Sequence, residues 1–338
     1  MWSDFTKNTI DQFTMLPTIK LHPNIIKFIK DERQKIISYN IKYDINIKKI
    51  NNFNQKIKDM SSTKWVDSKN LMNDIINLPI NIMITWNDNK ITIKCKKQHI
   101  NTFIKRINTL ISIIEYLKIK SGNINKVVDI YLILSSLEKK FPQDNVMDVV
   151  NANTGYTDFS NNIIFVWRYE EYEKVLFHEL IHYFNMDCKE YAQYLNENPI
   201  IDIDGPHDYI EAITDYFGII YNIIYISIIT NIKIENLLKI ELLFIKNQAY
   251  RLNILNNLNI WNDKPNIIIK QKTGAFSYYI IKYLLFRYIN KSGNIIDFNK
   301  DKKIDFVKLL NIILIDGMPK YNNIINIKSS RMTLLQLK

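Results

Sequence analysis

The sequence predicts an α+β protein in which strands lie before residue 168 and helices after it. Segments that alternate apolar and polar residues, or that are rich in β-branched residues, end before residue 168, whereas apolar residues at helical spacing dominate from Glu170 onward. Strands grouped ahead of helices are typical of the α+β class. The 338 residues are 47% hydrophobic and 23% charged, which provides a substantial core and excludes a disordered chain.

Each strand is predicted from its local pattern. Ile80–Trp86 and Lys90–Cys95 alternate apolar and polar residues on either side of the polar residues Asn87–Asn89, which predicts a β-hairpin. Further strands are predicted at the β-branched run Val127–Leu134, at the glycine-containing segment Val150–Phe159 and at the apolar run Ile163–Trp167.

The helices are predicted from periodicity. Residues 100–118 place apolar side chains three and four positions apart, which predicts an amphipathic helix. Pro206 follows an acidic break and suits the first turn of a second helix that runs on through Gly218. The first 75 residues have mixed periodicity, and no role is assigned to them.

Composition favours a cytoplasmic protein without a transmembrane segment. Two cysteines, Cys95 and Cys188, are too few for a disulfide framework. The first residues lack the basic and then apolar order of a secretory signal. The most apolar run, Phe217–Ile229, is too short and too polar to span a bilayer, so a buried helix is expected there.

The net charge of +11 is unevenly distributed. Residues 1–150 contain 24 Lys or Arg against 14 Asp or Glu, residues 151–215 contain 3 against 13, and residues 216–338 contain 18 against 7. The basic flanks offer contacts to nucleic acid, but no recognition motif accompanies them, so solvated lysines are the favoured interpretation. The acidic middle fits a cation site and predicts easier entry for a basic or neutral substrate than for an acidic one.

The strongest chemical signal is the sequence His178-Glu179-Leu180-Ile181-His182, an HExxH motif. Residues four apart lie on the same face of a helix, so both imidazoles can bind one metal ion. Glu179 lies beside them, where its carboxylate can accept a proton from a water molecule. The surrounding apolar residues and the acidic residues 170–173 predict a buried helix whose first turn is acidic.

A catalytic zinc site needs a third protein ligand, and the next helix supplies candidates. Glu211 and Asp215 are four residues apart and therefore share one face. One carboxylate can bind the metal, and the other can accept the second ring proton of a ligating histidine.

This pattern, HExxH followed by Glu-Ala-Ile-Thr-Asp on the next helix, resembles the gluzincin metallopeptidases of the thermolysin-like clan. The resemblance implies zinc held by His178, His182 and Glu211, with Glu179 as general base and Asp215 as the partner of a ligand histidine. It also implies a zincin-like fold in which an edge strand, placed at Ile163–Trp167, aligns the substrate backbone.

The resemblance covers residues 127–218 and has two departures. The 29 residues from His182 to Glu211 exceed the spacing in thermolysin itself, and the Gly-x-Met-Glu-Asn run of the aminopeptidase branch is absent. The rival metzincin pattern fails because Asn185 and Cys188 occupy its glycine and third histidine positions.

The domain and function predictions also follow from the resemblance. Residues 1–120 are expected to form a basic N-terminal extension, 121–218 a catalytic core and 219–338 a helical subdomain that completes the cleft. Zinc-dependent cleavage of a peptide or protein substrate is expected, with Tyr278, Tyr279 or His207 stabilising the oxyanion. The alternative is a catalytically silent metal-containing scaffold whose basic flanks contact nucleic acid or membrane. The composition resembles that of proteins from large A/T-rich DNA viruses, which would place the protein in host cytoplasm or virion.

Overall fold

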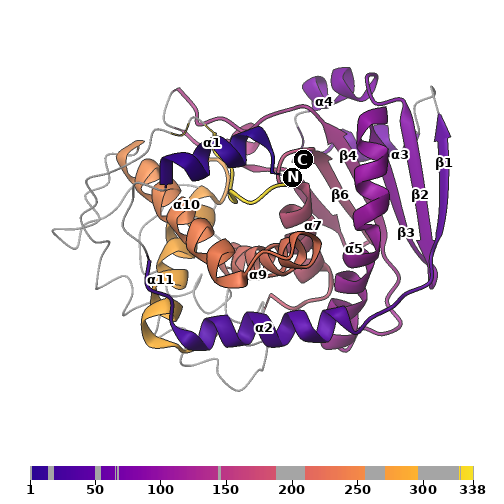
Figure 1. The fold of residues 1–338 in the computed structure, drawn as a ribbon. Helices are drawn as coiled ribbons and strands as arrows, with labels where there is room; N and C mark the ends of the chain where they lie inside the picture. The colour runs from indigo at the N-terminus through magenta and orange to yellow at the C-terminus, as the bar shows by residue number, and fades with distance from the viewer. Residues whose placement is uncertain are drawn as a thin grey trace.

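The computed structural model shows a mixed α+β protein with a six-stranded sheet and a mainly helical C-terminal half (Figure 1). It describes residues 2–13, 19–49, 55–64, 66, 68–143, 146–187, 210–255, 271–295, 327 and 329–337. The fold class predicted from the sequence is confirmed at this level.

The sheet has the strand order β1-β2-β3-β4-β6-β5. Strands β3, β4 and β6 are parallel, while β1, β2 and β5 pair antiparallel with their neighbours. The strands are β1 (Asp44–Lys49), β2 (Ile80–Trp86), β3 (Asn89–Cys95), β4 (Asp129–Ser135), β5 (Gly155–Asp158) and β6 (Ile163–Arg168).

The predicted hairpin is confirmed as β2 and β3. Its two turn residues, Asn87 and Asp88, have φ of 42° and 64°, a left-handed conformation that Asn and Asp tolerate better than most residues. Asn89 already belongs to β3, and its side-chain carbonyl accepts the backbone N–H of Val128, which ties the hairpin to the start of β4.

Two strand predictions need correction. The segment Val150–Phe159 is not one strand, because Asp148 caps a short helix α6 (Val149–Ala152) before β5 begins at Gly155. The predicted edge strand Ile163–Trp167 is a strand, β6, but it lies between β4 and β5. The edge of the sheet is therefore β5, because the chain turns back at residues 159–162 and adds β5 outside β6.

Helices cover both faces of the sheet. Alternate strand residues such as Ile130 and Val166 belong to the main core with helix α5 (Ile100–Lys120), which confirms the helix predicted at residues 100–118. The opposite side chains, such as Tyr131 and Trp167, pack against α3 (Gln55–Ser61) and α4 (Ser68–Ile75).

The N-terminal helices show that helices also occur before residue 168. α1 (Asp4–Phe13) packs against α10 (Ile234–Leu255), and α2 (Pro23–Ile37) packs against α5 and α9 (Ile210–Thr230). Among the described residues, one hydrophobic core contains side chains from residues 1–120, 121–218 and 219–338 alike. The N-terminal segment thus contributes both the sheet edge β1 and helices that cover the C-terminal half.

The helical half surrounds one buried central helix, α9. Its elements are α7 (Tyr172–Tyr183), α9 (Ile210–Thr230), α10 (Ile234–Leu255), the π-helix η2 (Ser277–Ile281) and α11 (Lys282–Ser292). By length and composition α9 qualifies to cross a membrane, but 89% of its apolar window is buried within the protein. The expectation that this apolar run is too short and too polar to span a bilayer is therefore wrong for the whole helix, whereas its expected burial is observed.

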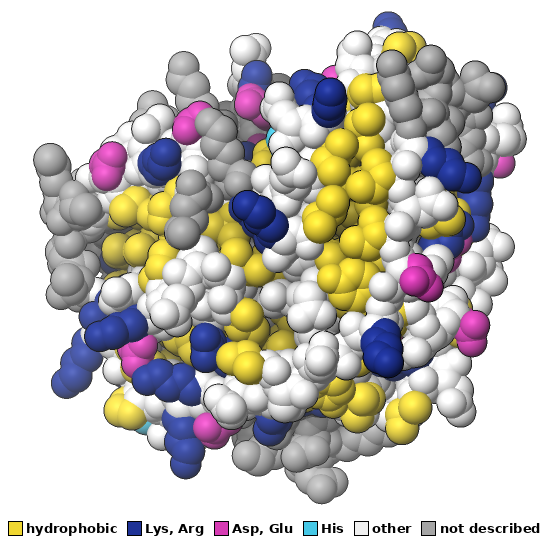
Figure 2. Space-filling view, turned by 45° about the vertical axis from the view of Figure 1, so that its right-hand side comes forward, with side chains coloured by type: hydrophobic (Ala, Val, Ile, Leu, Met, Phe, Trp, Pro, Cys, Tyr) yellow, Lys and Arg dark blue, Asp and Glu magenta, His cyan; other side chains and the backbone are white. Residues whose placement is uncertain are grey.

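The face at the β1 end of the sheet carries a band of hydrophobic side chains (Figure 2). Strand β1 is an edge of the sheet, and its Ile45 and Ile47 are exposed. Among the described residues on this face, the Lys and Arg side chains lie dispersed among hydrophobic and uncharged ones (Figure 2).

Candidate metal centre

Helix α7 carries both histidines of the HExxH motif and is buried along almost its whole length. It ends at Tyr183; Asn185, just beyond the end, has a left-handed φ of 52°, and the backbone N–H of Met186 returns to the carbonyl of Ile181. This turn brings the next residue, Asp187, back beneath the helix.

Three potential ligand atoms converge between α7 and α9. His178 Nε2 lies 3.2 Å from His182 Nε2 and 3.0 Å from Glu211 Oε2. The same Glu211 oxygen is 3.4 Å from His182 Nε2. One ligand atom from each of the three residues lies within 4.8 Å of the others, and the group can hold a metal ion.

Gly218 allows the two helices to approach at the first histidine. A Cβ atom on Gly218 would lie 3.3 Å from both Cβ and the backbone nitrogen of His178. Because this is tighter than ordinary packing, the absence of a side chain at Gly218 fits the close contact of α9 with α7. That contact positions Glu211, seven residues earlier on α9, opposite the histidines.

Each of the two imidazoles has a carboxylate at its Nδ1 nitrogen. Asp215 Oδ1 lies 3.1 Å from His178 Nδ1, and Asp187 Oδ2 lies 2.7 Å from His182 Nδ1. Both carboxylates are buried. An outer partner of this kind fixes the ring orientation and leaves Nε2 as the donor to a metal.

The titration of the three residues reflects their burial and mutual contact. Burial is the main cause that lowers the pKa of His178 to about 3, so this imidazole is neutral at neutral pH. Burial also lowers the pKa of His182, but Glu211 and Asp187 outweigh it and hold that pKa well above its usual value. Burial opposes ionisation of Glu211, yet His182 and His178 keep its pKa well below the usual range.

Glu179 belongs to α7, and its side chain faces the edge strand β5. Its Oε2 accepts a hydrogen bond of 2.8 Å from Thr157 Oγ1. A Cβ on Gly155 would lie 3.0 Å from Glu179 Oε1, so this glycine permits the close approach of β5. Burial is the largest cause that raises the pKa of Glu179 to about 7.

The three candidate ligand residues line a cleft of about 690 Å³. β5 forms part of its wall, and Tyr278 contributes from the π-helix with its ring 6.0 Å from that of His178. The prediction for Tyr279 needs correction, because its hydroxyl donates to the carbonyl of Ser330 in the interior. His207, the other predicted oxyanion residue, lies outside the described residues.

Among the described residues, several carboxylates of the acidic middle of the sequence pair with cations from other segments. The predicted acidic first turn of α7 is only partly present, because the helix begins at Tyr172, after Glu170 and Glu171. These two carboxylates pair instead with Arg331 and Lys139. The lining of the cleft includes Lys64 and Lys272 together with His178, His182 and Glu211. The net charge of residues 151–215 therefore does not predict the charge of the cleft.

Sequence reasoning missed four side chains next to the site. Asp187 lies a few residues after the end of the HExxH helix. An acidic residue at this position was the sequence signal that could have identified it as a partner of His182. Thr157 had no signal, since it comes from a different element. Lys174 and Lys282, whose ammonium groups both contact Asp215, were hidden among many lysines.

No family model matches the chain, and no curated protein or solved structure matches it either.

Proposed function

We propose that the protein is a zinc metallopeptidase of the gluzincin type, with His178, His182 and Glu211 as ligands and Glu179 as general base. The observation that carries the proposal is the convergence of two imidazole nitrogens and one carboxylate oxygen, each imidazole being held from behind by a buried carboxylate. Structural zinc sites are usually closed by four protein ligands, whereas catalytic sites keep a position open.

The donor set favours zinc over the hard cations. Two nitrogen ligands and one carboxylate suit Zn²⁺, while Ca²⁺ and Mg²⁺ prefer shells made of oxygen. Metal binding requires both imidazoles to be unprotonated: the lowered pKa of His178 means that it already is, whereas the raised pKa of His182 means that the metal must displace a proton from it. When bound, zinc would act as a Lewis acid and lower the pKa of water.

Glu179 is suited to transfer the proton. Its pKa of about 7, raised chiefly by burial, is near the value at which a carboxylate both accepts and returns a proton at neutral pH. The hydroxyl of Thr157 fixes the direction of the carboxylate. Glu179 would take a proton from water and deliver it to the leaving amine.

The cleft supports a peptide substrate. β5 is the edge of the sheet and has a strand partner on one side only among the described residues, so its other side is suited to pairing with an extended chain, and Thr157 on this strand touches Glu179. Tyr278 is the described side chain best placed to donate to an oxyanion. A zincin-like architecture is supported by the position of α7, which packs against both β5 and β6.

Metal content tests the ligand assignment. Purified protein is expected to contain one zinc per chain, and His178→Ala, His182→Ala and Glu211→Ala should each lose it. Elemental analysis after removal of loosely bound metal provides the readout. Full zinc content in the double histidine variant would exclude this site as the metal centre.

A further inference from the structure

The C-terminal segment, defined here as Ser329–Leu337, runs through the interior without forming a helix or strand. Residues 330–337 are all buried, although they end the described chain. An irregular buried segment must find partners for its backbone groups among side chains or other backbone. Those partners come from the residues just before α7 and from helices α10 and α11.

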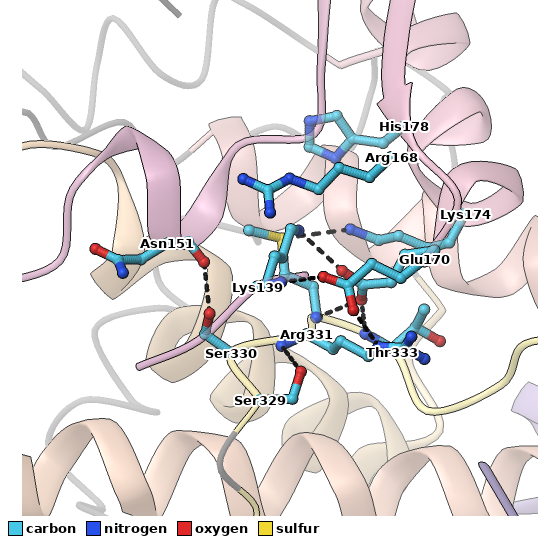
Figure 3. A network of polar contacts seen from close by, with 12 residues as sticks. Lys139, Asn151, Arg168, Glu170, Lys174, His178, Ser329, Ser330, Arg331 and Thr333 are labelled. Carbon is cyan, nitrogen blue, oxygen red and sulfur yellow. Dashed lines mark hydrogen bonds and ion pairs between the residues drawn. The ribbon is translucent and has the colours of Figure 1, made fainter. Parts of the chain in front are cut away.

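Two buried carboxylates accept the backbone N–H groups of this segment. Glu171, just before α7, accepts from Met332 and from Thr333, the latter at 2.6 Å. Glu241 on α10 accepts from Leu334 and Leu335. Glu170 adds a contact of 2.8 Å to the side chain of Arg331, as Figure 3 shows from close by.

Donors from the helices bind the carbonyl groups of the same segment. Gln248 on α10 donates to the carbonyls of Ser329 and Arg331, and Lys282 on α11 donates to that of Met332 at 2.9 Å. The C-terminal segment is thus bound much as a peptide ligand would be.

Two lysines connect this segment to Asp215, the carboxylate that faces His178. Lys282 Nζ contacts both the carbonyl of Met332 and, at 2.6 Å, Oδ2 of Asp215. Lys174 Nζ contacts Oδ1 of Asp215 and lies 3.7 Å from the sulfur of Met332. Oδ1 of Asp215 also faces His178 Nδ1.

The two oxygens of Asp215 therefore have different partners. Oδ1 meets His178 and Lys174, while Oδ2 meets Lys282. A carboxylate held at Oδ2 cannot rotate freely about its bond to Cβ, so Lys282 determines where Oδ1 points. Lys282 is itself held by the carbonyl of Met332. The position of the C-terminal segment therefore influences the orientation of Asp215 and, through it, of the His178 ring.

We propose that Lys174 and Lys282 are positioning residues of the metal centre, and that docking of the C-terminal segment and metal binding favour each other. The proposal rests on the zinc site proposed above. A coupling between two binding events is reciprocal: if the docked segment strengthens metal binding, bound metal must stabilise docking by the same factor.

Amide hydrogen exchange of the full-length protein, with zinc added or removed by chelator, measures this coupling. Zinc should slow exchange in peptides covering the C-terminal segment roughly tenfold more than in the β2–β3 hairpin, which reports general stabilisation, within the 5–150-fold range of typical couplings. Equal slowing in both regions would refute the coupling.

Two matched lysine variants show whether the coupling passes through Lys282. In Lys282→Met the extra protection of the C-terminal segment should disappear, while Lys120→Met, which breaks a separate contact with Glu32, should retain it. Extra protection that persists in Lys282→Met would overturn the role given to this residue. If zinc neither binds nor slows exchange anywhere, the zinc site itself is refuted, an outcome that metal analysis of the wild type distinguishes.

Discussion

Asp187 Oδ2 lies 2.7 Å from His182 Nδ1, so the turn that ends the HExxH helix holds the second histidine of that same helix. Asp215 does the same for His178 from the next helix. The two imidazoles are thus oriented by different parts of the chain, one local and one distant. This division allows each contribution to be tested separately.

Replacing Asp187 tests the local contribution. Asp187→Asn should keep the fold but weaken zinc affinity roughly 10- to 100-fold, because the amide no longer fixes the imidazole as a carboxylate does. Competition with a chromophoric chelator measures the affinity. Asp59→Asn is the control, since it removes the same charge from an exposed side chain of α3. Equal effects of the two changes would mean that Asp187 acts through general charge alone.

Replacing Thr157 tests how Glu179 is held. Thr157→Val removes the hydroxyl donor to Oε2, so kcat should fall about tenfold or more while zinc content stays at the wild-type level. The donor favours the ionised carboxylate, so its loss raises the pKa of Glu179. The acidic limb of the kcat–pH profile should therefore move to higher pH. Thr92→Val, a buried change on β3, should leave the profile in place.

Two glycines allow metal binding and catalysis to be separated. Ala at an interior helix position is ordinarily better than Gly by about 1 kcal/mol, yet Gly218→Ala should weaken zinc binding because its Cβ would crowd His178. Gly155→Ala should instead lower kcat and spare zinc affinity, because its Cβ would press on Val175 and Glu179. The reverse pattern would mean that β5 and α9 do not approach α7 as described.

The buried carboxyl group of Glu173 is expected to make the free energy of unfolding depend on pH. Burial raises its pKa to about 7, so the folded protein retains a proton that the unfolded chain releases near pH 4.5. Its contribution to stability is full below pH 4.5 and is lost as the pH rises to about 7, with each pKa unit worth about 1.4 kcal/mol. Glu173→Gln should therefore gain stability over wild type across this range, as urea unfolding measures. Exposed Glu138→Gln should show no such trend.

The sequence predicted those features that local patterns encode. The Asn87–Asp88 turn and the alternation around it gave the β2–β3 hairpin, and the fixed helical spacing of His178 and His182 brought their rings together. The spacing of Glu211 and Asp215 likewise placed both on the side of α9 that faces the histidines.

What the sequence missed depends on contacts between distant segments. Strand order made β5 the edge, because pairing of Gly155 with Val166 is not encoded in either segment alone. Glu170 and Glu171 looked like the acidic first turn of a helix, but tertiary contacts with Arg331 and Lys139 decided their place. Burial of Lys282 against Asp215 has no local signature.

Cleavage of a peptide library by zinc-loaded wild-type protein and by zinc-loaded Glu179→Gln tests the central claim most directly. Mass spectrometry of the products, with metal content matched, should show new peptide ends with the wild type and none with the variant. Added chelator should abolish the wild-type cleavage. Equal cleavage by both proteins would contradict the role of Glu179. No cleavage by the fully loaded wild type would contradict the peptidase assignment and favour the silent metal-containing scaffold.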